Sequence, residues 1–192
     1  MKRALLFVLP LLVFLALAAL FLSRLGENNE ALPTALAGKP LPAFRLPSLD
    51  GAVLSERDLH GPLLLNVWAT WCPACYEEHP YLLELAGKGI AIVGLNYKDD
   101  MQAARAFLAE RGSPYRQVLV DADGQLGLDL GVYGAPETFV IDAEGRIRHR
   151  VTGVVTPANF AREIAPLLGV PAVGIAASSS SAAPASGSGA AP

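Results

Sequence analysis

The sequence is poor in positive charge and contains only two cysteines. Its 192 residues include 15 Lys and Arg against 18 Asp and Glu, which leaves a formal net charge of −3. Because a nucleic-acid-binding surface needs a concentrated basic patch, this balance argues against a nucleic-acid partner. The cysteines, Cys72 and Cys75, are accompanied by no second Cys-x-x-Cys pair, and the chain shows no internal repeat. The length fits one domain with attached segments.

Residues 4–22 contain no charged side chain. As a helix that rises about 1.5 Å per residue, this stretch would reach about 28 Å, close to the ~30 Å hydrocarbon core of a bilayer. Lys2 and Arg3 precede the stretch and only Arg24 follows it closely. The positive-inside rule therefore places the N-terminus in the cytoplasm and the rest of the chain outside. We predict a single transmembrane helix that anchors the protein at residues 1–25.

The alternative interpretation is a signal peptide that is cleaved after export. Residues 35–37 (Ala-Leu-Ala) have the small-residue form of a cleavage site. The apolar run, however, exceeds the ~7–15 residues that are usual for the apolar core of a signal peptide, and the candidate site lies far beyond its end. These features favour the anchor, and both interpretations export the remainder of the chain.

Two segments outside the predicted domain have compositions that are typical of unstructured chain. Residues 26–37 combine Asn, Pro, Thr, Gly and small residues without hydrophobic periodicity, which indicates a tether. Residues 171–192 consist almost entirely of Ala, Ser, Gly and Pro. Such a segment cannot bury enough apolar area to offset the entropy of ordering, so we expect a disordered tail. The folded domain is expected at residues 38–170.

Within the predicted domain, strand and helix patterns alternate. Mostly apolar runs at residues 63–69 and 90–95 are too short for domain helices and are typical of strands buried on both faces. Helical patterns follow them at residues 72–86 and 99–111. The remaining expected elements are a hairpin at 44–46 and 53–54, a strand at 118–120, a helical turn at 125–130, a hairpin at 138–141 and 147–151, and a helix at 157–168. This order predicts an α/β fold with a mixed sheet.

The two cysteines stand where the first predicted helix begins, directly after a buried strand. A spacing of three on a helix places both sulfurs on one face, with Cα atoms close enough for a disulfide. Cys72 lies at the helix N-terminus, where unpaired N–H groups and the helix dipole stabilise a thiolate. Because the thiolate is the attacking species in disulfide exchange, we predict that Cys72 is the nucleophile and Cys75 the resolving thiol.

Three other uses of this cysteine pair fit the sequence less well. A structural zinc site would have to add His79 and a remote His60 or His149, because no second cysteine pair is present. A c-type haem site needs His directly after the second cysteine, where Tyr76 stands. A purely structural disulfide gains little stability from closing so short a loop. We therefore predict redox chemistry by the cysteines themselves, with no metal and no other cofactor.

The same helix carries carboxylates with different expected surroundings. At about 100° per residue, Glu78 falls within the inward arc that also holds Cys75, whereas Glu77 and Glu84 point to solvent. A buried Glu78 would have a raised pKa and could exchange protons with Cys75, while the alternative is a surface charge at the rim of the helix. His79 lies near the same arc, and we interpret it as a partly buried histidine without a catalytic part.

Several stretches of the sequence resemble one known family. Residues 68–75 (WATWCPAC), with Pro80 eight residues past the first cysteine, resemble the active site of the thioredoxin superfamily. Residues 131–139 (GVYGAPETF) resemble, more specifically, the signature of the CcmG/DsbE thiol:disulfide interchange proteins of cytochrome c maturation. Residues 96–100 (NYKDD) and 123–130 (DGQLGLDL) also match that subfamily. The resemblance covers nearly all of the predicted domain, and the anchor agrees with it.

The resemblance implies a thioredoxin-like fold: a mixed sheet with helices on both faces, an N-terminal hairpin and a central insert at about residues 98–132. It also implies a cis peptide bond between Ala135 and Pro136, with Pro136 facing the cysteines. Family members carry acidic groups near the disulfide, which match Glu78 and Glu137 here. From the residues alone, Glu137 could equally be an ordinary carboxylate at the edge of a strand.

A substrate and a location are implied by the same resemblance. The substrate would be the disulfide of the Cys-x-x-Cys-His motif in apocytochrome c, or that of a maturation partner that holds it. Haem attachment through thioethers requires free thiols, while an exported compartment oxidises them. Electrons would come from a membrane thiol–disulfide donor. With the predicted anchor, the protein would reside in the inner membrane with its C-terminal domain in the periplasm.

Three other functions remain open from the sequence. A general disulfide oxidant would share the motif, and its reduction potential would distinguish it. A thiol peroxidase would share the fold but would consume peroxide. A non-enzymatic module that binds apocytochrome or haem would keep its function when both cysteines are replaced.

Overall fold

The computed structural model describes residues 13–15, 17–19, 36–59 and 61–170. The chain divides into two units after Pro33, and each is described by itself. In the first unit the described residues are helical. Their exposed apolar side chains are Val13, Phe14, Leu15 and Leu17, with exposed fractions between 51% and 66%.

Three predicted segments lie mainly or wholly outside the described residues. They are the anchor at 1–25, the tether at 26–37 and the tail at 171–192. Within the part of the chain that the structure does describe, no helix is both long enough and apolar enough to cross a bilayer. The transmembrane helix, the tether and the disordered tail therefore stay predictions.

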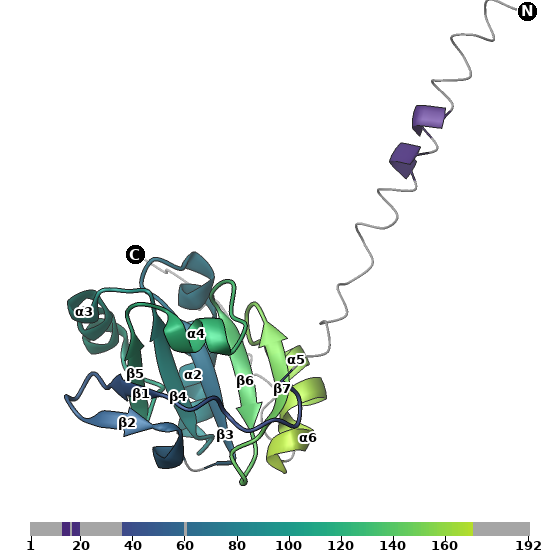
Figure 1. Ribbon diagram of the computed structural model, residues 1–192. Coiled ribbons are helices and arrows are strands. Elements are labelled where there is room, and N and C mark those ends of the chain that lie inside the picture. The colour runs from purple at the N-terminus through teal and green to yellow at the C-terminus, as the bar shows by residue number, and fades with distance from the viewer. Residues whose placement is uncertain (1–12, 16, 20–35, 60, 171–192) are drawn as a thin grey trace, which may run out of the picture. The chain divides into compact units, whose positions relative to one another are not determined.

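The second unit is built on a five-stranded sheet with the order β5-β4-β3-β6-β7 (Figure 1). β3 pairs in parallel with β4 and antiparallel with β6, which makes the sheet mixed. The strands are β3 (Leu63–Trp68), β4 (Ile92–Tyr97), β5 (Gln117–Asp121), β6 (Glu137–Ile141) and β7 (Ile147–Thr152). Every residue of β3 and β4 is buried, which confirms that the two short apolar runs form central strands.

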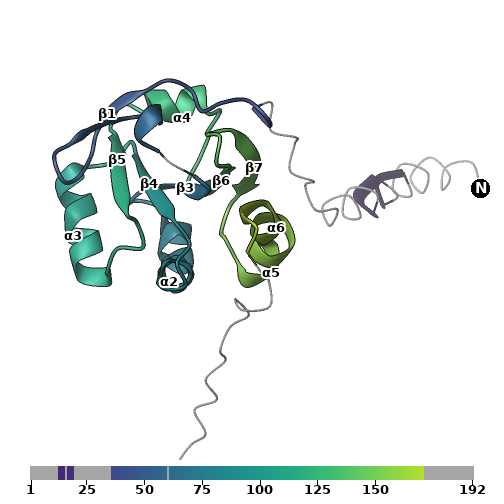
Figure 2. The same cartoon turned by 90° about the horizontal axis from the view of Figure 1, so that it is seen from below.

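Helices cover both faces of this sheet, as predicted. Figure 2 shows α2, α3, α5 (Pro157–Asn159) and α6 (Ala165–Leu168) on one side and α4 with β1 on the other. The bounds are α2 (Pro73–Gly87), α3 (Met101–Arg111), α4 (Gln125–Asp129), β1 (Arg45–Pro47), β2 (Val53–Ser55) and the 3₁₀ turn η1 (Glu56–Asp58). We call the two sides the α2 face and the α4 face. Leu64, Trp68 and Val140 belong to the apolar cluster of the α2 face, whereas Val67 and Phe139 belong to that of the α4 face. The predicted N-terminal hairpin is confirmed as the antiparallel pair β1 and β2.

The segment 98–132, expected as a central insert, contains α3, β5 and α4. It is tied firmly into the main sheet, because β5 pairs in parallel with β4 as an edge strand. Asp121, at the end of β5, accepts the backbone N–H groups of Leu126 and Gly127 at 3.2 and 2.8 Å. These bonds satisfy the free N–H groups at the start of α4.

The start of α3 differs from the prediction in an informative way. The helix begins at Met101 rather than at residue 99, because the side chain of Asp100 caps it by accepting the N–H of Ala103 at 2.8 Å. Asp99 therefore lies outside the helix, and its carboxylate is available for other contacts.

The last predicted helix, at 157–168, has the expected extent but not the expected hydrogen bonding. It consists of α5 (Pro157–Asn159), the π-helical segment η2 (Phe160–Ile164) and α6 (Ala165–Leu168). Pro166 has no N–H to donate and so cannot continue a regular α-helix. Just before it, the N–H of Ala165 bonds to the carbonyl of Phe160, five residues earlier. The predicted N-cap, Thr156, is confirmed, since its side chain accepts the N–H of Asn159.

Candidate active site

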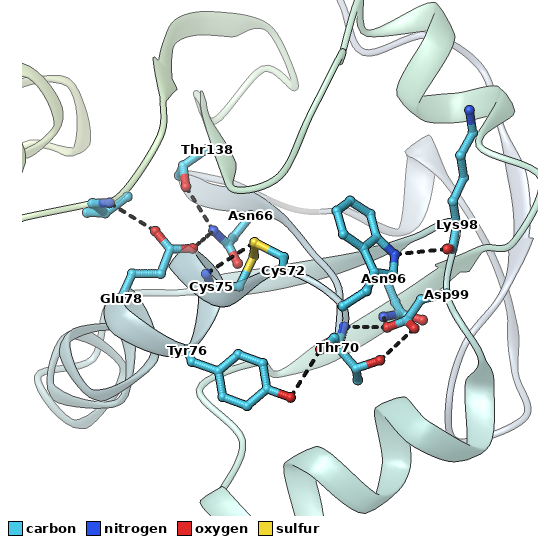
Figure 3. The surroundings of a disulfide bond; sticks show 12 residues. Asn66, Thr70, Cys72, Cys75, Tyr76, Glu78, Asn96, Lys98, Asp99 and Thr138 are labelled. Carbon is cyan, nitrogen blue, oxygen red and sulfur yellow. Dashed lines mark hydrogen bonds between the residues drawn. A yellow bond between two sulfur atoms is a disulfide. The ribbon is translucent and has the colours of Figure 1, made fainter.

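Cys72 and Cys75 stand at the start of α2 and are joined by a disulfide bond, with Cα atoms 5.4 Å apart (Figure 3). Cys72 is the N-cap residue of the helix, and its sulfur accepts the backbone N–H of Cys75 at 3.2 Å. Pro73 follows at the first helical position, where a missing N–H leaves no bond unmade. In the reduced protein, the same N–H group and the positive end of the helix dipole stabilise a thiolate at Cys72.

The disulfide lies beneath the surface, next to the loop that precedes β6. The exposed fractions of Cys72 and Cys75 are 2% and 3%, so burial does not distinguish the two sulfurs, whereas their positions on the helix do. Ala135 packs against the apolar cluster that contains both cysteines. The bond between Ala135 and Pro136 is cis, as the family resemblance implied. Pro136 itself is buried, and its predicted position facing the cysteines stays a prediction.

Glu78 is buried within the domain, which rules out a surface charge at the helix rim. Only 1% of this residue is exposed. One carboxylate oxygen accepts the side-chain N–H of Asn66 at 2.9 Å, and the other accepts the backbone N–H of Val155 at 2.9 Å (Figure 3). Both partners are neutral donors. Burial raises the pKa of Glu78 to about 7, although these two hydrogen bonds act in the opposite direction.

Sequence reasoning missed the polar side chains that hold Glu78. Asn66 donates to Glu78 and to the hydroxyl of Thr138 at 3.0 Å, and it accepts the hydroxyl of Tyr115 at 2.8 Å. Asn66 and Thr138 pair across β3 and β6, with both side chains on the α2 face. The available signal was Asn66 itself, the one amide in an otherwise apolar strand. A polar side chain at a fully buried strand position needs hydrogen-bond partners, so Asn66 predicts a polar network around it.

A glycine opposite this network allows two aromatic rings to pack beside it. A Cβ atom at Gly94 would come within 2.8 Å of Trp68 Nε1 and 3.0 Å of Tyr115 Cγ. The Trp68 and Tyr115 rings stack with centroids 5.5 Å apart. Gly94 therefore makes room for the tyrosine whose hydroxyl fixes Asn66.

The expected place of Glu137 beside the disulfide is corrected by the structure. Glu137 pairs with Val67 in the sheet register, and Val67 faces the α4 side, so the Glu137 side chain points away from α2. Glu137 Oε2 lies 2.5 Å from Arg150 Nη2, an ion pair without the directed geometry of a hydrogen bond, and Oε1 accepts the N–H of Tyr133 at 3.4 Å. Glu137 is as buried as Glu78, at 1%, but it is compensated by a cation and lies on the other face.

Of the other helix carboxylates, Glu84 was expected in solvent but is half-buried and pairs with Lys88. Glu77 is exposed, whereas His79 is buried and its Nε2 lies 3.0 Å from the carbonyl oxygen of Gly112. Burial also lowers the pKa of His79. His149, the distant histidine considered for zinc, contacts Glu163 at 3.1 Å, and His60 lies outside the described residues. Among the side chains that the structure does describe, no group of three or more His, Cys, Asp or Glu is arranged to hold a metal ion.

Comparison with known proteins identifies the family of the chain. Residues 36–164 match the model of the Redoxin family. The chain is 52% identical over 179 residues to the thiol:disulfide interchange protein DsbE of Escherichia coli (strain K12), covering 87% of this chain and 95% of that protein. It is also 52% identical over 170 residues to the protein of the same name from Pseudomonas aeruginosa, covering 87% and 94%.

Solved structures show the same fold. A secreted Mycobacterium tuberculosis disulfide oxidoreductase that is homologous to E. coli DsbE superposes with a TM-score of 0.57 at 26% identity, over 65% of this chain and 96% of that chain. A thio-disulfide isomerase from Thermus thermophilus superposes with a TM-score of 0.60 at 23% identity, over 70% and 97%. The second likeness bears on the fold alone. Together they confirm the thioredoxin-like mixed sheet with flanking helices.

Proposed function

We propose a function from the family to which the chain belongs, the Redoxin family and, within it, the DsbE thiol:disulfide interchange proteins. The protein reduces the disulfide of apocytochrome c, or of a maturation partner that holds apocytochrome, before haem is attached. It is a thiol–disulfide oxidoreductase. The observation that carries the proposal is the Cys72 sulfur at the N-cap of α2, bonded to Cys75 and accepting the Cys75 N–H.

The reaction requires only the two cysteines of the reduced protein. The Cys72 thiolate attacks one sulfur of the substrate disulfide, forms a mixed disulfide and releases the other substrate sulfur as a thiolate, which takes up a proton. Cys75 then loses its proton and attacks the Cys72 sulfur. This step releases the second substrate thiol and forms the Cys72–Cys75 disulfide that the structure contains. Two electrons pass from the two cysteines to the substrate disulfide, which takes up one proton from Cys75 and one from water. A membrane thiol–disulfide donor then reduces the Cys72–Cys75 disulfide again and so supplies the next two electrons.

We assign Glu78 the role of accepting the Cys75 proton. The two residues are three apart on α2 and share the face that packs on the sheet. With a pKa of about 7, the Glu78 carboxylate is partly ionised at neutral pH and can accept a proton or release it. Its partners, Asn66 and the Val155 N–H, hold it in place and carry no charge.

Pro136 and Glu137 are assigned to the substrate-facing loop. Pro136 has no N–H and is buried, while its neighbour Ala135 is half-buried and packs on the apolar cluster that contains both cysteines, so we assign this loop to contact the bound peptide. Glu137 acts on the loop from the opposite face, through its contacts to the Tyr133 N–H and to Arg150. Its role is to position the loop.

The location follows from the N-terminal segment. The helical residues 13–15 and Leu17 expose apolar side chains, and the uncharged stretch 4–22 is long enough for a bilayer helix. Lys2 and Arg3 favour the orientation that leaves the C-terminal domain in the periplasm. This topology supports an inner-membrane protein whose domain meets exported apocytochrome.

The test is to trap the mixed disulfide with an oxidised peptide that carries the Cys-x-x-Cys-His motif. Reduced Cys75→Ser protein should accumulate a disulfide-linked adduct with the peptide, because the resolving thiol is missing, whereas Cys72→Ser should form none. A peptide with both cysteines replaced by serine is the control. Adduct formation through Cys75 alone would reverse the assignment, and consumption of hydrogen peroxide in place of peptide reduction would identify a thiol peroxidase.

A further inference from the structure

The loop that delivers Cys72 to the helix is fastened to a different part of the fold. Residues 69–71 connect β3 to α2, and Thr70 lies in the middle of them. The Thr70 N–H donates to Asp99 Oδ2 at 2.6 Å, and the Thr70 hydroxyl donates to Asp99 Oδ1 at 2.7 Å (Figure 3). Asp99 stands between β4 and α3, 29 positions further along the chain.

The Asp99 carboxylate is itself held from two more directions. Oδ2 accepts the side-chain N–H of Asn96 at 2.8 Å, and Oδ1 accepts the N–H of Asp100 at 2.9 Å. Burial acts to raise the pKa of Asp99, but the bonds from Thr70, Asn96 and Asp100 outweigh it and leave that pKa below its usual range. The group is thus a fixed carboxylate anion whose bonds reach the catalytic loop.

Two further bonds fasten the same loop. The Thr70 carbonyl accepts the hydroxyl of Tyr76 from α2 at 3.0 Å, and the indole N–H of Trp71 donates to the carbonyl of Lys98 at 3.0 Å. Lys98 has a φ of +48°, and it is the sole residue other than glycine with a positive φ in the described part of the chain. Such a conformation is uncommon for a side-chain-bearing residue. Here it accompanies a carbonyl that meets Trp71, directly before the nucleophile.

From these contacts we infer that Asp99 is a positioning residue for the catalytic cysteine: it holds Thr70 so that the Cys72 sulfur stays at the N-terminus of α2 after the disulfide has opened. In the oxidised protein the bond to Cys75 fixes Cys72. Reduction removes that tie, and the sulfur then depends on the backbone of residues 69–71 for its place. The inference rests on the proposed function, because it concerns the reduced, attacking form of the same site.

Position and charge predict opposite effects for Asp99. If the residue acts by holding the loop, loosening it moves the sulfur away from the helix N–H groups and raises the pKa of the Cys72 thiol. If it acts by its negative charge, removing that charge stabilises the thiolate and lowers the pKa of the thiol. The sign of the change therefore identifies the mechanism.

The experiment measures the Cys72 thiol pKa, by thiolate absorbance, in full-length protein that carries Cys75→Ser. Thr70→Val removes the hydroxyl donor without changing any charge, and Asp99→Asn weakens the acceptor. Asp100→Asn is the matched control, because it also removes one carboxylate charge and still caps α3. We expect Thr70→Val and Asp99→Asn each to raise the thiol pKa and to slow mixed-disulfide formation about tenfold, with Asp100→Asn unchanged.

Three outcomes would overturn the inference. A lower thiol pKa in Asp99→Asn, with Thr70→Val unchanged, would show that the carboxylate acts through its charge. Equal effects in all three variants would show that the change is not specific to the contact between Thr70 and Asp99. No effect in any of them would show that the loop needs no such support. The proposed function is tested separately, because the pKa measurement needs no substrate. A wild-type protein that fails to react with the oxidised peptide would contradict the function and leave the thiol pKa result standing.

Discussion

Two glutamates are equally buried on opposite faces of the same sheet, and their partners differ completely. Glu78, from α2, is held by two neutral donors, Asn66 and the Val155 N–H. Glu137, on β6, is paired with the guanidinium of Arg150. An uncompensated buried carboxylate can take up a proton near neutral pH, whereas a compensated one remains part of an ion pair. Equal burial therefore does not imply an equal role.

Arg150, the partner of Glu137, also contacts two aromatic rings. Its guanidinium lies 4.9 Å from the centroid of the Tyr133 ring and 5.6 Å from that of Phe139. Tyr133 is 77% exposed, and the guanidinium that pairs with Glu137 packs against its ring. On the α4 face the carboxylate contacts the Tyr133 N–H and Arg150, while on the α2 face it is held by Asn66 and the Val155 N–H.

Removal of the Arg150 cation should have the largest effect on stability. Arg150→Met leaves the Glu137 charge buried and unpaired, which typically destabilises a protein by about 3–5 kcal/mol. The free energy of unfolding of the oxidised protein, measured with a chemical denaturant, should fall by that amount. Replacing Glu137 with Gln in the same chain should recover part of the loss, because the uncompensated charge is then gone.

Arg148→Met is the matched control on the same strand. Arg148 contacts Asp142 at 3.3 Å, but its side chain is 51% exposed. Exposed ion pairs contribute about 0–1 kcal/mol, so this substitution should change the unfolding free energy little. Similar losses for Arg148→Met and Arg150→Met would show that the buried pair carries no special weight.

A second prediction concerns the pH dependence of stability that Glu78 confers. Its pKa is about 7 in the folded protein and 4.5 as the ordinary value. The folded state therefore binds the proton more tightly than the unfolded state does. The stabilisation is fully present below about pH 4.5 and is lost as the pH rises through 7, and the 2.5-unit difference corresponds to about 3 kcal/mol. Denaturant unfolding of the oxidised wild type at several pH values between 4 and 8 measures this loss.

Glu78→Gln should abolish this part of the pH dependence. A carboxamide cannot titrate, and one of its ends would place an N–H group against Asn66 or the Val155 N–H, which adds a cost that does not vary with pH. Glu77→Gln, on the exposed side of α2, should retain the wild-type pH profile. A profile that is unaltered by Glu78→Gln would mean that another group titrates in this range.

The sequence was sufficient to predict which elements form and where the cysteines lie, because both follow from local patterns. Short apolar runs indicated β3 and β4, and the position of Cys72 after a strand indicated a helix N-terminus. The inward arc of α2 also placed Glu78 correctly. Glu137 was misplaced because the face of a strand residue depends on its register with β3, and the family pattern alone did not supply that register.

The polar network was missed for a related reason. Asn66, Thr138 and Tyr115 come from three separate strands or loops, and only the assembled sheet brings their side chains together. The same holds for Thr70 and Asp99, which are neighbours in space but 29 positions apart in the chain. A buried amide predicts that partners exist but does not identify them.

The smallest expected change is in the reduction potential of the Cys72–Cys75 couple. It tests whether the effect of a buried carboxylate on this potential depends on the face of the sheet on which the carboxylate lies. A negative charge near a sulfur disfavours its thiolate and so destabilises the reduced form. Glu78→Gln removes a charge on the disulfide's face and should lower the thiol pKa and raise the reduction potential by about 20–30 mV, roughly 1 kcal/mol for two electrons. Because the pKa of Glu78 is about 7, this difference in reduction potential should be present above about pH 8 and vanish below about pH 6, where the wild-type carboxylate is protonated.

Glu137→Gln also removes a buried charge, but that charge is paired and lies on the α4 face, so the potential should stay at the wild-type value at either pH. Equilibration with glutathione or thioredoxin at the two pH values gives the potentials. Equal shifts from both substitutions would mean that total charge, and not the face on which it lies, sets the potential.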